Sequence, residues 1–503
     1  MSKLIIILLL AVVVGIPFVL RPVADVDEAY ASDGDRLIVV TPHNEQTRHE
    51  FALAFNDWRR AQGLAPVRFD WRTTGGTSDQ RRTIVSHFEA NAAAGRENEG
   101  IGIDLFFGGG DFEHNQLARG ITIERDGEQV RIPLLVAPKL APNALDEAFL
   151  TRFIGSSPLY HEDGRWIGTA LASFGIVYNR DVLRMLDLPE PQTWADMAAP
   201  RYQGWIALAD PSHSGSIAAT YNIIIRRTGW NEGWRTMRQV FANARYFTSG
   251  ASKVPVDVSK GEAAAGMCID FYGRFQAGAV GGDRVGYVDP AGMTAITADP
   301  VAILRGAPNR ELADQFVNWM ITREAQRLWQ RRIDAPDGPE RFELRRQPVR
   351  QDLYTPAERA HWSDPEIAPF DEATPLPDAI PDFYGMVAPV TKAMAIDVHE
   401  HLVAAWAAIA RTPDDHPDKA RMIELFEAMP DDLVLHWPDE GLAADWQAIV
   451  NDPDHPRHSE VERVLDEFSE HLSSYRGDTL INARLRWTRF FRDNYREVVR
   501  LSP

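Results

Sequence analysis

The most constraining feature of this sequence is a recurring unit in which a short apolar run is followed by a polar loop and then by an amphipathic segment. Residues 206–226, IALADPSHSGSIAATYNIIIR, show it most fully. The run 206–209 fits a buried strand, and turn-forming residues dominate 210–215. Four apolar residues then fall on one face of a helix: Ile217, Tyr221, Ile224 and Ile225. The stretch therefore predicts a strand, a loop and the N-terminus of a helix.

The loop of this unit has two interpretations. Ser214, Gly215 and Ser216 would lie at a helix N-terminus, whose unpaired N–H groups and positive dipole end attract anions. The alternative is plain N-capping by Ser214 or Ser216, with no ligand, and such caps are common. Taken alone, the stretch favours capping.

Three similar units lie nearer the N-terminus. Apolar runs at 37–41, 67–71 and 103–107 are each followed by a polar or glycine-rich loop. In open α/β sheets, ligands gather at the carboxyl ends of the strands, so we expect an α/β fold whose loops line one site. The candidate residues in these loops are Pro42, His43, Asn44, Thr74, Gly75, Gly76, Thr77, Gly109, Gly110 and Asp111. Together the loops favour a ligand site over isolated caps.

Composition and missing motifs exclude several classes of protein. A chain of 503 residues should hold two or three domains, and its net charge of −19 argues against a nucleic-acid partner. The single cysteine, Cys268, excludes an internal disulfide framework and a multi-cysteine metal site. The sequence contains no Walker A, HExxH, GxGxxG or GxSxG motif. We therefore expect no catalytic residues, and a binding protein rather than an enzyme.

The N-terminus indicates export. Lys3 precedes an apolar run at 4–20, which is at the border between a signal-peptide core and a membrane-spanning helix. A small-x-small cleavage pattern occurs at 29–31, farther from the apolar run than cleavage usually tolerates. We expect residues 1–35 to be a membrane anchor and linker, with a cleaved signal peptide as the alternative. Either way the body would be periplasmic or otherwise outside the cytoplasm.

The C-terminal part has a different character. Residues 354–382 are rich in proline and acidic residues and show little periodicity, which indicates a linker or wrapping loop. Beyond it, the segments 386–411, 420–429, 442–449, 460–472 and 481–498 are predicted to be mainly helical. We therefore expect residues 355–503 to form a helical extension, whose role the sequence does not indicate.

Over most of 36–354 the chain resembles the extracellular solute-binding proteins of ABC importers, in the branch that includes ferric-iron-binding proteins. Six stretches carry the resemblance: LIVVTPHNEQTRHEFALAFNDW, IDLFFGGG, WIGTALASFGIVYN, TWADMAAPRYQGWIALADPSHSGS, SKGEAAAGMCIDFYGR and ELADQFVNWMITREAQRLW. The resemblance implies two α/β lobes joined by hinge strands and closing on a ligand. It places lobe 1 at 36–170 and 275–354 and lobe 2 at 171–274, with Ser173 between the hinge strands.

The resemblance also bears on metal binding. Iron-binding members hold ferric iron through adjacent tyrosines, a histidine and a glutamate, and oxygen ligands suit that hard ion. Here the tyrosine pair matches Phe271 and Tyr272, and the histidine could correspond to His43. The glutamate's place falls in 108–110, where there is no carboxylate. A ferric site built on His43 and Tyr272 is therefore the second choice.

The first choice of ligand is a small organic anion of carboxylate, phosphate or phosphonate type, bound without a cofactor. Backbone N–H groups and hydroxyls bind such anions without a metal. The loops of lobe 1 would face Ser173, Ser214, Gly215, Ser216, Asp270 and Tyr272, with Asp270 and Tyr272 fixing a hydroxyl or an amine. The implied partners are ABC permease subunits and, through the N-terminal segment, the membrane, and we expect a monomer. An alternative is a membrane-tethered sensor or assembly factor that reuses the binding fold.

Overall fold

The computed structural model describes residues 35–125 and 127–503. Its first lobe is built on a seven-stranded sheet in the order β16-β9-β15-β3-β1-β2, with β6 paired to β15. The first three strands in the chain are parallel to one another, whereas β15 runs antiparallel to β3, β6 and β9. The strands of this sheet are β1 (Arg36–Val40), β2 (Arg68–Arg72), β3 (Leu105–Phe107), β6 (Leu135–Val136), β9 (Ile167–Ala172), β15 (Thr297–Leu304) and β16 (Gln347–Pro348).

Apolar periodicity accounts for how the helices pack on this sheet. In the first helix, Phe51 and Phe55 are fully buried one turn apart and contact Trp319, so this face packs into the lobe 1 core. The helices of the lobe are α3 (Glu45–Ala61), α4 (Thr77–Ala93), α5 (Gly110–Arg119), α6 (Ala144–Ala148), α12 (Arg310–Met320) and α13 (Arg323–Arg327). Two hairpins complete it, β4 (Ile121–Arg125) with β5 (Glu128–Ile132) and β7 (Phe153–Ile154) with β8 (Ser157–Pro158).

Lobe 2 contains a five-stranded sheet in the order β12-β11-β13-β10-β14. Its strands are β10 (Phe174–Asn179), β11 (Ile206–Ala209), β12 (Ala244–Thr248), β13 (Ala265–Ile269) and β14 (Val285–Val288). The helices are α7 (Arg180–Met185), α8 (Gly215–Thr228), α9 (Trp230–Ala242), α10 (Lys253–Ser259) and α11 (Asp270–Val280). The predicted unit at 206–226 is present as β11, a loop and α8, and every residue of β11 is buried.

The chain passes twice between the sheet of lobe 1 and the sheet of lobe 2. The first crossing is at Ser173, between β9 and β10, close to the expected position. The second lies between β14 and β15, after Val288 rather than at 274. The difference arises because β14 pairs with β10, which keeps residues 275–288 with lobe 2.

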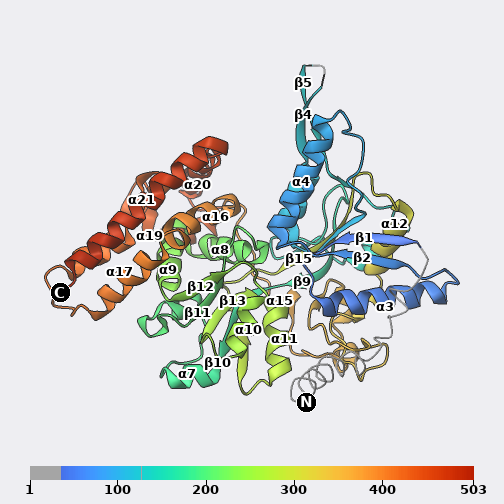
Figure 1. The fold of residues 1–503 in the computed structure, drawn as a ribbon, viewed down its shortest axis with the longest axis horizontal. Coiled ribbons are helices and arrows are strands. Elements are labelled where there is room, and N and C mark those ends of the chain that lie inside the picture. Colours follow the sequence, from blue (N-terminus) through green and yellow to red (C-terminus); the bar gives the residue numbers. More distant parts are fainter. Residues whose placement is uncertain (1–34, 126) are drawn as a thin grey trace, which may run out of the picture.

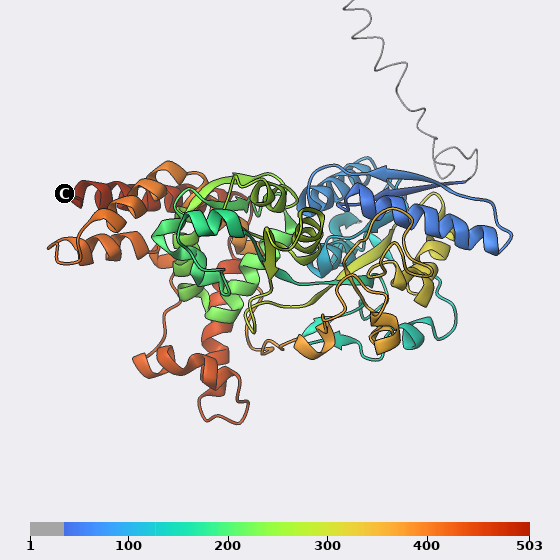
Figure 2. The same cartoon turned by 90° about the horizontal axis from the view of Figure 1, so that it is seen from below.

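The C-terminal residues form the predicted helical extension. A connector, defined here as residues 355–382, carries the short helices α14 (Pro356–Arg359) and α15 (Pro369–Glu372). The C-terminal helices follow: α16 (Tyr384–Thr391), the π-helical turn η4 (Lys392–Ile396), α17 (His399–Arg411), α18 (Lys419–Glu427), α19 (Glu440–Val450), α20 (His458–Ser473) and α21 (Gly477–Leu501). They pack against lobe 2: α16 lies beside α8, whereas α17 and α21 lie at the end of the molecule remote from lobe 1 (Figure 1). In the perpendicular view, part of the C-terminal helices extends below lobe 2 (Figure 2).

The apolar N-terminal run at 4–20, predicted to be an anchor or signal peptide, lies outside the described residues. Across 35–125 and 127–503, no helix has the length and apolar character needed to span a bilayer.

Candidate ligand-binding site

A cavity of about 330 Å³ lies between the two lobes, where the loops after β1, β2 and β3 meet the loops of lobe 2. The structure brings most of the predicted site residues to its wall: Pro42, His43, Gly75, Gly76, Thr77, Gly109, Gly110, Asp111, Ser214, Gly215, Ser216 and Tyr272. The loop 249–252 before α10 and three side chains that sequence reasoning missed, Asp79, Asp299 and Tyr384, also line it.

Four predicted residues do not line this cavity. Asn44 accepts a hydrogen bond from the Thr47 N–H at 3.1 Å and so caps α3, while Thr74 is exposed to solvent. Ser173 and Asp270 line a separate cavity of about 300 Å³ beside the hinge. There Ser173 donates to Asp289 at 2.7 Å, because the hinge strands turn this hydroxyl away from the cleft.

The N-terminus of α5 holds an anion that belongs to the protein. The N–H groups of Gly109 and Gly110 donate to Asp299 Oδ1, at 2.6 and 3.3 Å. Both glycines have positive φ, 108° and 79°, which side-chain-bearing residues rarely adopt. The triglycine loop was expected to offer these donors to a ligand. In the structure, the carboxylate of Asp299 from β15 accepts both hydrogen bonds.

Asp299 is charge-compensated by two buried side chains. Arg346, fully buried, donates to Asp299 Oδ2 at 2.5 Å, and His43 Nε2 lies 3.0 Å from the same oxygen. Burial alone would raise the pKa of Asp299, but Arg346 and His43 hold it well below its ordinary value. Burial lowers the pKa of His43, so the ring is neutral at pH 7.

This arrangement gives little support to a ferric site on His43 and Tyr272. His43 Nδ1 lies 3.0 Å from the Thr41 hydroxyl, so both ring nitrogens already have partners within the protein. The Tyr272 hydroxyl donates to the carbonyl of Pro42 at 3.4 Å, and burial raises its pKa to about 12. Within the described part of the chain, no group of three or more His, Cys, Asp and Glu residues is placed to hold a metal ion.

Two other helix N-termini face the cavity. α4 begins after Gly76, and no side chain caps it. α8 begins after Ser214, whose hydroxyl accepts from the Ile217 N–H at 3.4 Å and lies 3.2 Å from the Ser216 hydroxyl. The capping interpretation of Ser214 is thus correct, while Ser216 remains beside the cavity. Unpaired N–H groups at these helix ends can bind an anion.

The two lobes contact each other around the cavity. The Gly215 N–H donates to Thr77 Oγ1 at 3.1 Å, joining α8 to α4. His213 Nδ1 lies 3.0 Å from Asp79 Oδ2, and Arg82 donates to the Ser212 carbonyl at 2.9 Å. These contacts describe a closed cleft.

The cavity also contains an acidic group without a cationic partner in contact. Asp111 Oδ1 accepts from the Phe112 N–H at 3.0 Å. Burial, and after it the charge of Asp382, raise the pKa of Asp111 to about 6. A carboxyl in this state can accept a hydrogen bond from a hydroxyl or an amine.

Comparison with known proteins agrees with this geometry. Residues 141–357 match the family of bacterial extracellular solute-binding proteins, which bind solutes and are not enzymes. The phosphoglycerate transport regulatory protein PgtC of Salmonella typhimurium is 26% identical over 168 residues, which is 32% of this chain and 40% of PgtC. The chain therefore aligns with less than half the length of this relative.

Solved structures confirm the fold. The periplasmic binding protein AfuA from Actinobacillus pleuropneumoniae, solved with exogenous fructose-6-phosphate bound, aligns with a TM-score of 0.53 at 17% identity, covering 74% of this chain and 98% of AfuA. The periplasmic binding protein P5PA aligns with a TM-score of 0.51 at 18% identity, covering 74% and 99%. The predicted two-lobed α/β fold, with helices beyond it, is therefore confirmed.

Proposed function

We propose that this chain, whose residues 141–357 match the bacterial extracellular solute-binding protein family, captures a small phosphorylated or carboxylated organic solute between its lobes and delivers it to an ABC permease. The observation that carries the proposal is the closed cavity of about 330 Å³ at which the uncapped end of α4 meets the end of α8. Helix N-termini and hydroxyls bind an anionic group without a metal or a cationic side chain.

The rest of the wall suggests what the solute carries besides its anionic group. Asp79 and Asp111 would repel a second anionic group and accept hydrogen bonds from hydroxyls or an amine. The volume is at the small end of ligand sites, which fits a molecule of a few carbons. The similarity to PgtC and AfuA points to phosphoglycerate and fructose 6-phosphate as the first solutes to test.

The test is a thermal-unfolding screen of the purified protein against 3-phosphoglycerate, fructose 6-phosphate, inorganic phosphate, small carboxylates and ferric citrate. A solute at a hundredfold excess over its Kd stabilises the folded state by about 2.7 kcal/mol. We expect a phosphorylated or carboxylated solute to raise the melting temperature, and fructose without phosphate to leave it unchanged. If ferric citrate alone stabilised the protein, the iron alternative would replace this proposal.

Ser216→Ala locates the anionic group. Ser214 caps α8, so removing the Ser216 hydroxyl leaves the cap in place. We expect about fivefold weaker binding, the usual value for one hydrogen bond. Ser473→Ala, on the exposed end of α20, is the matched control. Equal affinity in the two variants would place the anion elsewhere.

A second candidate is a sensor that reports the bound solute to a partner. It is favoured by the helices beyond the matched fold and by the similarity to PgtC, a phosphoglycerate transport regulatory protein. Measuring solute uptake and solute-induced gene expression in cells without the protein separates the two candidates. Transport predicts lost uptake, and sensing predicts lost induction with normal uptake.

A further inference from the structure

The C-terminal helices are continuous with the core of lobe 2. One hydrophobic cluster includes the lobe 2 sheet and side chains from α16 to α21. Trp230 of α9 donates to the Leu433 carbonyl at 2.6 Å, and the fully buried Arg238 donates to the Ala428 carbonyl at 3.0 Å. The helices and lobe 2 therefore form one body.

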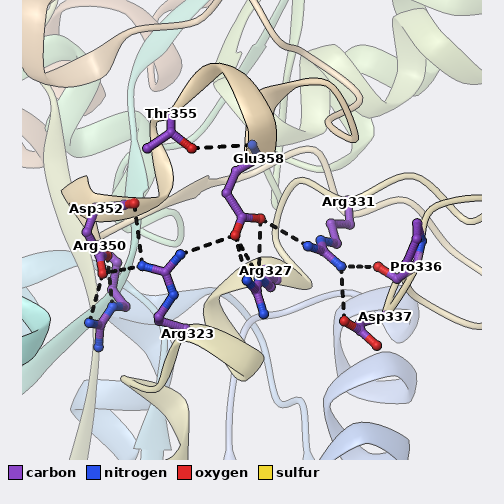
Figure 3. A network of polar contacts seen from close by, with 9 residues as sticks. All are labelled: Arg323, Arg327, Arg331, Pro336, Asp337, Arg350, Asp352, Thr355 and Glu358. Atoms are coloured by element: carbon purple, nitrogen blue, oxygen red, sulfur yellow. Dashed lines mark hydrogen bonds and ion pairs between the residues drawn. The ribbon is translucent and has the colours of Figure 1, made fainter.

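The connector is fixed to lobe 1 by a partly buried ion-pair network (Figure 3). Arg327, Arg331 and Arg323 converge on the Glu358 carboxylate, with shortest contacts of 2.6, 3.0 and 3.2 Å. Burial opposes the charge of Glu358, but hydrogen bonds from Arg327 and Arg331 outweigh it and lower the pKa to about 2. Farther along, the Leu376 N–H donates to Ser156 Oγ at 2.8 Å.

The end of the connector is fixed to lobe 2. Arg226 of α8 donates to the Ile380 carbonyl at 2.8 Å, and Asn222 donates to Asp382 Oδ1 at 2.9 Å. Asp382 in turn accepts from the Tyr384 N–H at 3.0 Å, which orients the first residue of α16. The connector thus spans from one lobe to the other and ends at the cavity.

Tyr384 projects from α16 into the interlobe cavity. Its ring stacks on Phe112 of α5, with ring centroids 3.7 Å apart. Its hydroxyl lies 3.2 Å from Glu113 Oε1 on lobe 1 and 3.1 Å from the Gly215 carbonyl on lobe 2. Glu113 is fully buried and also accepts from Ser78 at 2.6 Å, so the tyrosine meets a rigid partner.

We propose that Tyr384 is a ligand-contacting residue of this cavity, supplied by the C-terminal extension, and that its contacts with Glu113 and Gly215 hold the two lobes together. The claim that Tyr384 contacts the ligand rests on the proposed function, whereas the claim that it holds the two lobes together does not. In the bound state the hydroxyl would be shared with an oxygen of the solute, beside Ser216 at the start of α8. Selectivity for the solute would then depend on a residue outside the two-lobed fold.

The test measures the distance between the lobes in the full chain with and without solute. Spin labels at Ala94→Cys on lobe 1 and Lys260→Cys on lobe 2 occupy exposed positions, and the native Cys268 is buried. Tyr384→Phe keeps the ring on Phe112 and removes the hydroxyl. We expect the interlobe distance of the solute-free protein to shift to longer values in this variant.

Tyr475→Phe is the matched control, because Tyr475 also donates to a carboxylate, Asp432 at 2.7 Å, but lies within the C-terminal helices. Its interlobe distance should equal that of the parent. Glu113→Gln removes the charged acceptor from the lobe 1 side and should shift the distance in the same direction as Tyr384→Phe. A distance unchanged in both cleft variants would overturn the proposal.

The second part of the test measures the affinity of each variant for 3-phosphoglycerate or fructose 6-phosphate, whichever stabilises the parent protein. We expect Tyr384→Phe to bind it about fivefold more weakly, as for one lost hydrogen bond, and Tyr475→Phe to bind it normally. Unchanged affinity for Tyr384→Phe would overturn the ligand contact. If neither solute bound the parent, the proposed function would fail for these solutes, and the distance measurement would still decide the lobe-bridging role.

Discussion

Helices α4 and α5 both begin after a glycine at the edge of the same sheet and point their N-termini at the same cavity, yet only one of them is open. At α5, the N–H groups of Gly109 and Gly110 are occupied by Asp299. At α4, no side chain caps the helix after Gly76. A glycine-rich loop before a helix therefore predicts an anion at that position, but the anion can be a carboxylate of the protein.

The two helix ends differ because of residues distant in sequence. Asp299 comes from β15 and its partner Arg346 from the segment before β16. Arg346 also stacks on Phe271, at 4.2 Å from the ring centroid to the guanidinium carbon. Phe271, which the sequence resemblance matched to a tyrosine, thus supports this cation. Together these residues make the α5 end a structural element, whereas no side chain caps α4 and Ser216 of α8 still lines the cavity.

The largest predicted effect concerns the N-terminus of α5, where Asp299 accepts the hydrogen bonds of Gly109 and Gly110. Arg346→Met removes the main cation facing Asp299 and leaves a buried carboxylate with only His43 and two N–H groups. Breaking a buried ion pair from one side costs about 3–5 kcal/mol. We expect a loss of that size in the free energy of unfolding, measured by urea denaturation at pH 7.

The control for this prediction is Arg463→Met, which removes an exposed arginine paired with Glu467 at 3.0 Å. Exposed pairs contribute about 0–1 kcal/mol, so this variant should unfold almost like the parent. Similar losses in the two variants would show that Asp299 does not depend on Arg346, and the α5 end would no longer differ from the α4 end.

The second prediction concerns the N-terminus of α4, which no side chain caps. In Gly76→Ala the added Cβ would lie 2.0 Å from the His213 carbonyl oxygen across the cleft, so the lobes cannot close as observed. The φ of Gly76 is −82°, which alanine adopts, so the fold of lobe 1 should be unaffected. We expect solute affinity to fall about 10- to 100-fold, equivalent to about 1.4–2.8 kcal/mol, measured by isothermal titration calorimetry.

Gly250→Ala provides the comparison, because its added Cβ meets nothing within 4 Å although the residue lines the same cavity. Its affinity should match that of the parent. If Gly76→Ala bound equally well, the closed arrangement around α4 and α8 would not be the binding state.

The smallest effect concerns a carboxyl at the start of α5. A helix N-terminus favours a carboxylate, but burial and Asp382 outweigh it for Asp111 and raise the pKa from 3.8 to about 6. Because the folded state then holds the proton more tightly than the unfolded chain, this group's contribution to stability falls as the pH rises from about 4 to 6. Asparagine does not ionise, so Asp111→Asn does not lose stability in this way as the pH rises.

We therefore expect the free energy of unfolding of Asp111→Asn at pH 7, measured by urea denaturation, to exceed that of the parent by roughly 1–2 kcal/mol. This difference should shrink towards pH 4. Asp283→Asn, on an exposed loop of lobe 2, is the control variant for the change of charge. A difference that grew towards low pH would reverse the sign and show that Asp111 is stabilised as a carboxylate, as Asp299 is.

Much of the fold follows from local patterns. The strand, loop and helix at 206–226 and the C-terminal helices are present as expected, because apolar periodicity reports which face of each element is buried. The second crossing between the lobes was misplaced because α11 and β14 carry no local signal of the lobe they join.

The loops of the site could be predicted from the sequence, but the side chains that contact these loops could not. The wall contains the predicted glycine and serine loops, since they follow the strands directly. Asp299, Arg346 and Tyr384 were missed because their roles depend on contacts with residues 47 to 271 positions away, for which the sequence shows no pattern. Ser173 and Asp270 line the cavity beside the hinge instead, because Ser173 lies where β9 passes into β10 and Asp270 is the first residue of α11.

The connector has a consequence for rates. The lobes are joined by the chain at Ser173, again between β14 and β15, and a third time by the connector, which is held at both ends by buried or charge-assisted hydrogen bonds. Under the proposed function, opening the cleft to exchange a solute would have to bend the connector or break some of these bonds. Dissociation should be slow and strongly temperature-dependent, so that the lifetime of the complex, rather than its affinity alone, sets how long a captured molecule remains available to a partner.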